Sequence, residues 1–145
     1  MVITIETLSQ PMVLELITTL DLDFASRLTQ SVDLCEYSVK LSKHARFVVA
    51  CIEEKIAGII AFYENTSTGE LYVPYVCTNE NYRKQGVANS LLNKLIEFAD
   101  SISYNIALEV LRTNHVAISL YGKFGFQICN ENDIKYYMKR LSKFD

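Results

Sequence analysis

The stretch NYRKQGVANSLLNKLIEFA, residues 81–99, places cations and a glycine where a strongly periodic apolar helix begins. The first N–H groups of a helix lack intrahelical partners and, together with the helix dipole, favour a bound anion. Gly86 and Ala88 have minimal side chains, which lets an anion approach the backbone, while Arg83 and Lys84 add positive charge. The pattern Arg83-x-x-Gly86-x-Ala88 therefore predicts an anion-binding turn. On this pattern alone, a solvated helix start with basic residues remains the alternative.

Two familiar phosphate loops, G-x-x-x-x-G-K-[ST] and G-x-G-x-x-G, are absent from the sequence. A second unusual group is Glu109, which interrupts the apolar run IALEVL in a strand that we expect to be covered on both faces. A carboxylate buried there is costly unless it is paired or hydrogen-bonded.

Alternating and helical patterns predict the elements that position these groups. We expect a strand over 2–8, a helix over 10–20 with Pro11 in its first turn, and a helix capped by Ser31 that carries Asp33 in its opening turn and runs to about Leu41. Two strands within 45–65 should meet at a tight turn, Glu53–Lys55. Further on we expect a strand over 71–77, the helix 84–99, a strand over 104–111, a helix over 114–122, a turn at Gly125 and a last strand over 134–141.

The helix 84–99 repeats apolar residues every three or four positions, at Ala88, Leu91, Leu92, Leu95, Ile96 and Ala99, and should bury that face on a sheet. The strand–helix–strand unit around it predicts a parallel crossover. Ligands bind such sheets at the carboxyl ends of the strands, and here that end leads into the segment NENYRKQG. The expected fold class is α/β (α+β): a mixed, mostly antiparallel six- to seven-stranded sheet with helices on both faces.

The composition places limits on function. The 145 residues fit a single domain, 1–145, and a net charge of −3 argues against nucleic acid as a partner. We expect no signal peptide and no membrane span, and we expect a cytoplasmic protein. The cysteines are scattered without metal-ligand spacing, which favours reduced, buried thiols over a zinc site or a disulfide framework.

Two segments of the sequence resemble motifs of a known protein family. The segment YRKQGVA after a strand is similar to the cofactor-binding signature [QR]-x-x-G-x-[GA] of the GNAT superfamily of N-acetyltransferases. The segment LEVLRTNHVAISLYGKFGF resembles the pattern L-E-V-x-x-x-N-x-x-A-x-x-L-Y-x-x-x-G-F of the same superfamily. The resemblance extends from about Arg46 to Phe126 and implies the acyl-CoA N-acyltransferase fold.

The resemblance implies acetyl-CoA as cosubstrate and no metal. Its pantetheine arm would pair with the strand backbone at Val76, Cys77 and Thr78. The diphosphate would lie on the turn and helix start, at Arg83, Lys84, Gln85, Gly86, Val87, Ala88 and Asn89. Asn114 matches an asparagine that contacts the cofactor, although asparagine is also a good helix cap, and both roles are compatible.

Catalytic roles also follow from the resemblance. Tyr121 matches the general acid that protonates the departing thiolate; the alternative is a tyrosine packed in the core. Glu109 matches a glutamate that some members use as general base and others keep without that role. Glu70 and Glu80 are rival bases, and a covalent route through Cys77 is disfavoured because no group is evidently placed to activate the thiol.

The implied activity is direct transfer of an acetyl group to a primary amine of a small molecule: an amino sugar, an amino acid or a polyamine. Two alternatives stay open, acetylation of protein N-terminal α-amines and a non-catalytic CoA-binding regulatory module. Asp23, Tyr37 and Tyr75 are the expected acceptor contacts, and the resemblance allows a homodimer. Pro74 departs from the expected strand pattern and either opens the pantetheine slot or weakens it.

Overall fold

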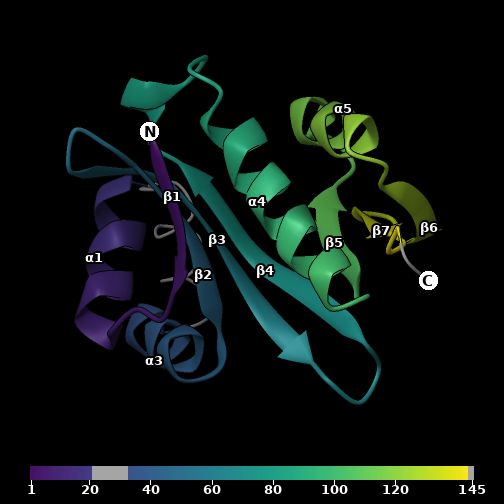
Figure 1. Ribbon diagram of the computed structural model, residues 1–145, viewed down its shortest axis with the longest axis horizontal. Helices are drawn as coiled ribbons and strands as arrows, with labels where there is room; N and C mark the ends of the chain where they lie inside the picture. Colours follow the sequence, from purple (N-terminus) through teal and green to yellow (C-terminus); the bar gives the residue numbers. More distant parts are fainter. Residues whose placement is uncertain (21–32, 144–145) are drawn as a thin grey trace. The chain divides into compact units, whose positions relative to one another are not determined.

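The computed structural model describes residues 1–20 and 33–143 (Figure 1). Its strands are β1 (Val2–Glu6), β2 (Arg46–Ile52), β3 (Lys55–Asn65), β4 (Glu70–Thr78), β5 (Asn105–Leu111), β6 (Gln127–Glu131) and β7 (Lys135–Arg140). Its helices are α1 (Gln10–Leu20), α3 (Leu34–His44), the short 3₁₀ helix η1 (Glu80–Tyr82), α4 (Val87–Ser101) and α5 (His115–Lys123). No helix in this part of the chain is long and apolar enough to cross a membrane.

The described strands form a seven-stranded sheet in the order β1-β2-β3-β4-β5-β7-β6. β1 pairs with β2, β5 with β7, and β6 with β7 in antiparallel fashion, whereas β4 and β5 are parallel. The helix α4 connects the two parallel strands, as a parallel pair requires a crossover. The predicted fold class and the predicted crossover are therefore confirmed.

The chain divides into two compact units. Unit 1 consists of Met1–Ala61 with Tyr75–Leu91, and unit 2 consists of Phe62–Pro74 with Leu92–Asp145. In unit 1 the middle of β2 is buried without interruption from Phe47 to Ala50, which means that both faces of this strand are covered. Helices α1 and α3 pack together, and the fully buried Ser38 of α3 accepts a hydrogen bond from Gln10 Nε2 at 2.9 Å.

In unit 2 the burial of β5 alternates, with Ile106, Leu108 and Val110 buried and the residues between them half-exposed. Glu109 therefore lies on a half-exposed face, and the expectation of a strand covered on both faces is wrong. The strand gains its core contacts through one face only, as is common where a sheet has one solvated side. Phe62 and Phe98 add an aromatic contact within the same unit, with ring centroids 5.7 Å apart.

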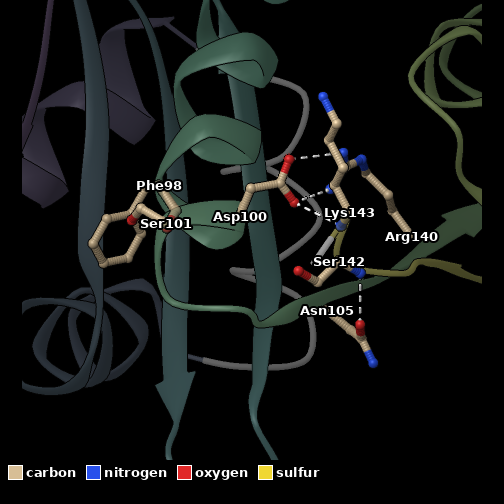
Figure 2. A network of polar contacts seen from close by, with 7 residues as sticks. All are labelled: Phe98, Asp100, Ser101, Asn105, Arg140, Ser142 and Lys143. Atoms are coloured by element: carbon tan, nitrogen blue, oxygen red, sulfur yellow. Dashed lines mark hydrogen bonds and ion pairs between the residues drawn. The ribbon is translucent and has the colours of Figure 1, made fainter. Parts of the chain in front are cut away.

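A polar network joins the C-terminal segment of unit 2 to α4 and β5 (Figure 2). Arg140 donates to both carboxylate oxygens of Asp100, at 2.9 and 3.1 Å, and the Lys143 N–H donates to Oδ1 at 3.1 Å. The Ser142 N–H donates to Asn105 Oδ1 at 2.8 Å. These bonds attach the segment after β7 to the last turn of α4 and to the start of β5.

Several predicted boundaries are wrong. The helix α3 begins at Leu34 and ends at His44, and its cap is Asp33, whose side chain accepts from the Cys35 N–H; Ser31 lies outside the described residues. The helix α4 begins at Val87 rather than at 84, because Lys84 and Gly86 adopt left-handed φ angles of 66° and 77°. Strand β6 and the helix η1 were not predicted.

Candidate active site

The predicted anion-binding turn, Arg83–Gly86, is an exposed segment of unit 1. After η1, the residues Arg83–Gly86 change direction through two left-handed positions, and Gly86 O accepts the first bond of α4, from the Ser90 N–H at 3.0 Å. The N–H groups of Val87, Ala88 and Asn89 precede that bond and belong to the helix turn that has no intrahelical acceptor. Two exposed cationic residues, Arg83 and Lys84, directly precede these N–H groups in the chain.

The space around Gly86 is open. A Cβ placed on this residue would meet no atom within 4 Å, so the backbone is open to a close approach. Val87 is buried, whereas Arg83, Lys84, Gln85 and Asn89 are exposed. The buried Val87 holds the helix start against unit 1, since a Cβ on Gly58 would come within 2.9 Å of Val87 Cγ1. The turn is therefore accessible from solvent, and its role as an anion site stays a prediction.

Pro74 lies inside β4. Within unit 2 the parallel ladder joins Glu70–Val73 to Asn105–Leu108. Whether Pro74 opens the pantetheine slot or weakens it stays a prediction. Cys77 is buried, and its Sγ donates to Leu20 O at 3.8 Å.

Tyr121 lies on α5 in unit 2, where its ring packs against Phe126 with centroids 5.6 Å apart. Burial raises the pKa of the Tyr121 phenol above its ordinary value, so the hydroxyl remains a proton donor at neutral pH. Every fully buried side-chain polar atom among the described residues has a partner.

Asn114 caps α5, as predicted: its Oδ1 accepts from the Ala117 N–H at 3.2 Å. This contact fixes the start of the helix that carries Tyr121. The capping role does not test the second predicted role, contact with a cofactor, because the amide nitrogen of a capping asparagine is free to donate elsewhere.

Glu109 has neighbours on two strands of unit 2. Lys135 Nζ lies 3.1 Å from Glu109 Oε2, and the register of β5 and β7 places Tyr137 directly opposite Glu109. Tyr72 of β4 lies on the same face of the sheet and interacts electrostatically with Glu109. Burial raises the pKa of Tyr72 to about 12, with the charge of Glu109 as the second cause. Glu109 is thus a paired, half-exposed carboxylate.

The remaining predicted groups are dispersed. Glu70 forms an ion pair with Lys139 at 2.9 Å, and Glu80 lies exposed in η1. Tyr75 is buried and Tyr37 is half-buried, whereas Asp23 lies outside the described residues.

The structure therefore gathers Val76–Thr78 and the turn in unit 1, and Glu109, Asn114 and Tyr121 in unit 2. The sequence reasoning missed Tyr72 and Lys135. The alternation of β4 indicates that Tyr72 and Glu70 share a face, but the residue of β5 that lies beside Tyr72 depends on the strand register.

The expectation that all cysteines are buried is wrong: none of the four forms a disulfide, but Cys35 and Cys129 are exposed. The thiol at Cys77 is the one that fits the expected buried environment.

The sheet order, the parallel crossover and the open turn at the start of α4 define a protein with the acyl-CoA N-acyltransferase fold. Residues 13–126 match the acetyltransferase (GNAT) family. The chain belongs to this family.

Known proteins support the same assignment. The chain is 31% identical over 100 residues to the N-acetylaspartate synthetase of Xenopus tropicalis, a match covering 68% of this chain and 36% of that protein. It is 29% identical over 101 residues to the L-amino acid N-acetyltransferase AaaT of Escherichia coli (strain K12), covering 67% and 61%. The chain therefore spans only part of these relatives.

Among solved structures, the PaiA N-acetyltransferase of Thermoplasma acidophilum in complex with coenzyme A superimposes with a TM-score of 0.73 at 17% identity. The match covers 97% of this chain and 99% of that protein. At this identity the likeness concerns the fold.

Proposed function

We propose that this protein transfers the acetyl group of acetyl-CoA directly to a primary amine of a small molecule. The observation that carries the proposal is the open turn Arg83–Gly86 followed by the free N–H groups of α4, within a chain of the GNAT family. A turn of this kind suits the diphosphate of CoA, because N–H groups, helix dipole and cations converge on one anion. The backbone of Val76–Thr78, at the end of β4, would take the pantetheine arm.

Acetyl-CoA supplies a thioester whose C–S bond breaks as the acceptor nitrogen bonds to the acetyl carbon. The residues of this chain would move two protons. Glu109 would accept the proton that the amine must lose, directly or through water. Tyr121 would donate its phenolic proton to the departing sulfur, a role that suits a hydroxyl kept protonated by burial of its ring.

Two relatives are named for N-acetylaspartate synthesis and L-amino acid acetylation, and these names support an α-amino acid as the acceptor class. The chemistry agrees. With a pKa near ~8, an α-amine loses its proton at neutral pH for under ~1 kcal/mol, whereas a lysine-like amine of pKa ~10.4 requires ~4 kcal/mol. A single half-exposed carboxylate such as Glu109 is then a sufficient base.

Acetylation of protein N-terminal α-amines is the second candidate, because it has the same low deprotonation cost. A partly exposed carboxylate on an open sheet face could serve a peptide as well as a free amino acid.

The first test is thermal unfolding with and without millimolar acetyl-CoA, with acetate and ATP as controls. A ligand at 100 times its dissociation constant adds ~2.7 kcal/mol of stability, a clear rise in melting temperature. We expect the rise with acetyl-CoA and not with acetate.

Two matched glycine variants sharpen this test. Gly86→Ala and Gly69→Ala both place a Cβ at a left-handed glycine with no atom within 4 Å, so their backbone costs should be alike. Only Gly86→Ala adds its methyl group where the diphosphate would lie, and only this variant should lose stabilisation by acetyl-CoA. Equal stabilisation of both variants would contradict the assignment of the turn.

A further inference from the structure

One half-exposed face of the sheet in unit 2 carries paired charges and tyrosines. This face, called the open face below, is formed by alternate residues of three strands: Glu70, Tyr72, Glu109, Lys135, Tyr137 and Lys139. The register places Tyr72 beside Ala107, two residues before Glu109, and places Tyr137 opposite Glu109. Glu109 therefore lies between β4 and β7 side chains in the middle of the open face.

Glu109 and Lys135 form an ion pair, but this pair does not use all the hydrogen-bonding positions of either group. An ionised carboxylate offers about four acceptor positions. Among the described residues, Lys135 Nζ occupies one of them at 3.1 Å, and the Tyr72 phenol interacts electrostatically with the same carboxylate. A lysine ammonium carries about three donors, of which one goes to Glu109 among the described residues. The Lys135 side chain is 43% exposed and the Glu109 side chain 30%, so a solute can reach both charges.

We propose that Glu109 and Lys135 together recognise a zwitterionic α-amino acid, with Glu109 accepting from its α-ammonium and Lys135 donating to its α-carboxylate. This proposal deepens the proposed function and rests on it, because it assigns the acceptor of the same reaction. In an α-amino acid the two charges are separated by one carbon, and in Glu109 and Lys135 the complementary charges lie 3.1 Å apart. Docking the two pairs closes a ring of four alternating charges, in which each ion has two opposite neighbours.

The charge balance of the open face favours this class over the other amines. Glu70 and Lys139 form a second pair at 2.9 Å, so the carboxylates and ammonium groups named on this face cancel. A polyamine or an amino sugar brings positive charge without a carboxylate and would meet Lys135 as a like charge. A peptide N-terminus lacks the adjacent carboxylate and would leave Lys135 without its second partner.

Tyr72 would keep Glu109 in the orientation that this recognition needs. Its phenol stays protonated through the physiological range, because burial and then the charge of Glu109 raise its pKa to about 12. While Glu109 is ionised, the protonated hydroxyl can therefore act toward this carboxylate only as a donor. After acetylation the α-nitrogen is neutral and the product is an anion, so the attraction to Glu109 is lost and product release is favoured.

The experiment compares L-amino acids with their carboxamides, which keep the α-amine and lose only the carboxylate charge. Binding to the CoA-saturated protein is measured by calorimetry, and kcat/KM is measured with acetyl-CoA; spermidine, glucosamine and an N-terminal peptide are included. We expect the best free amino acid to exceed its carboxamide by about 10-fold or more in both measurements, the scale of one charge-assisted hydrogen bond.

Two lysine variants test the assignment to one residue. Lys135→Met should abolish the preference for the free acid over the carboxamide, whereas Lys135→Arg should retain it. Lys139→Met is the matched control, because Lys139 lies on the same strand and face, is 40% exposed and also pairs with a glutamate. It should keep the preference.

Equal use of acid and carboxamide, preference for the peptide or the polyamine, or equal effects of the two methionine variants would overturn this inference. Its failure can be separated from failure of the proposed function. If acetyl-CoA stabilises the protein and some amine is acetylated without preference for a zwitterion, only the acceptor assignment falls. If acetyl-CoA neither stabilises the protein nor supports acetylation of any amine, both fall.

Discussion

Asp100→Asn is the substitution for which the structure gives the clearest stability effect. Asp100 and Arg140 are each 14% exposed, and the guanidinium reaches both carboxylate oxygens (Figure 2). The Lys143 N–H adds a third donor. Asparagine has nearly the same shape, so the substitution removes the charge and one acceptor with little change in packing.

The magnitude follows from opposing effects. Removing one partner of a buried ion pair costs about 3–5 kcal/mol, and an exposed pair contributes under about 1 kcal/mol. The Asp100 pair lies nearer the buried case, which suggests a loss of about 2–3 kcal/mol. Asp100 also lies in the last turn of α4, where a negative charge opposes the helix dipole by about 0.3–1 kcal/mol, and asparagine removes this penalty. We expect a net loss of about 2 kcal/mol, or roughly 4–8 °C in melting temperature for a chain of this size.

Chemical denaturation of wild type, Asp100→Asn, Arg140→Met and the double variant gives the coupling energy directly. Glu70→Gln is the control, because its pair with Lys139 is 26% and 40% exposed and should cost under about 1 kcal/mol. A coupling energy below about 0.5 kcal/mol, or a larger loss in Glu70→Gln, would refute the estimate.

The same substitution predicts a dependence on pH. The hydrogen bond from Arg140 is the main cause that holds the pKa of Asp100 below its ordinary value. A lowered pKa stabilises the folded state above the unfolded pKa, about 3.9, and this stability is lost as pH falls through the folded value. The advantage of wild type over Asp100→Asn should therefore be constant near neutrality and shrink in acid.

Three further predictions concern the tyrosines and a hairpin. Tyr121→Phe should lower kcat by about 10²- to 10⁴-fold and leave stabilisation by acetyl-CoA unchanged; an unchanged kcat would exclude Tyr121 as the acid. Because the pKa of Tyr72 is raised to about 12, this group stabilises the folded state fully below pH ~10 and progressively less as pH rises toward the folded value. Tyrosinate absorbance should show that titration moving to lower pH in Glu109→Gln, and an unmoved titration would contradict the contact. Glu53 and Glu54 have left-handed φ angles of 50° and 67° at the turn between β2 and β3, so replacing them by Asn-Gly should stabilise the protein by about 1–2 kcal/mol in denaturation; a loss would refute the strain.

The sequence was most informative where one periodic signal decided the structure. Helix α1 occupies the predicted residues 10–20, because its apolar spacing and Pro11 define both the face and the start. The start of α4 was misplaced because nothing in the residue type of Lys84 indicates a left-handed backbone. Strand β6 was missed because all its residues are exposed, so it has no alternation of burial to leave a pattern in the sequence.

The candidate site was predictable only in part, because the environment of Glu109 depends on strand register. The glutamate in an apolar run was visible in the sequence, but residue types alone do not decide whether a strand is covered on one face or two. The pairing of Tyr72 with Ala107, and of Glu109 with Tyr137, determines that Tyr72 and Lys135 reach the same carboxylate. A shift of one residue in either ladder would turn one partner to the opposite face and leave the carboxylate with different neighbours. The variants that test recognition by Glu109 and Lys135 therefore also test this register, because a preference that depends on Lys135 but not on Lys139 requires Lys135 to lie beside Glu109.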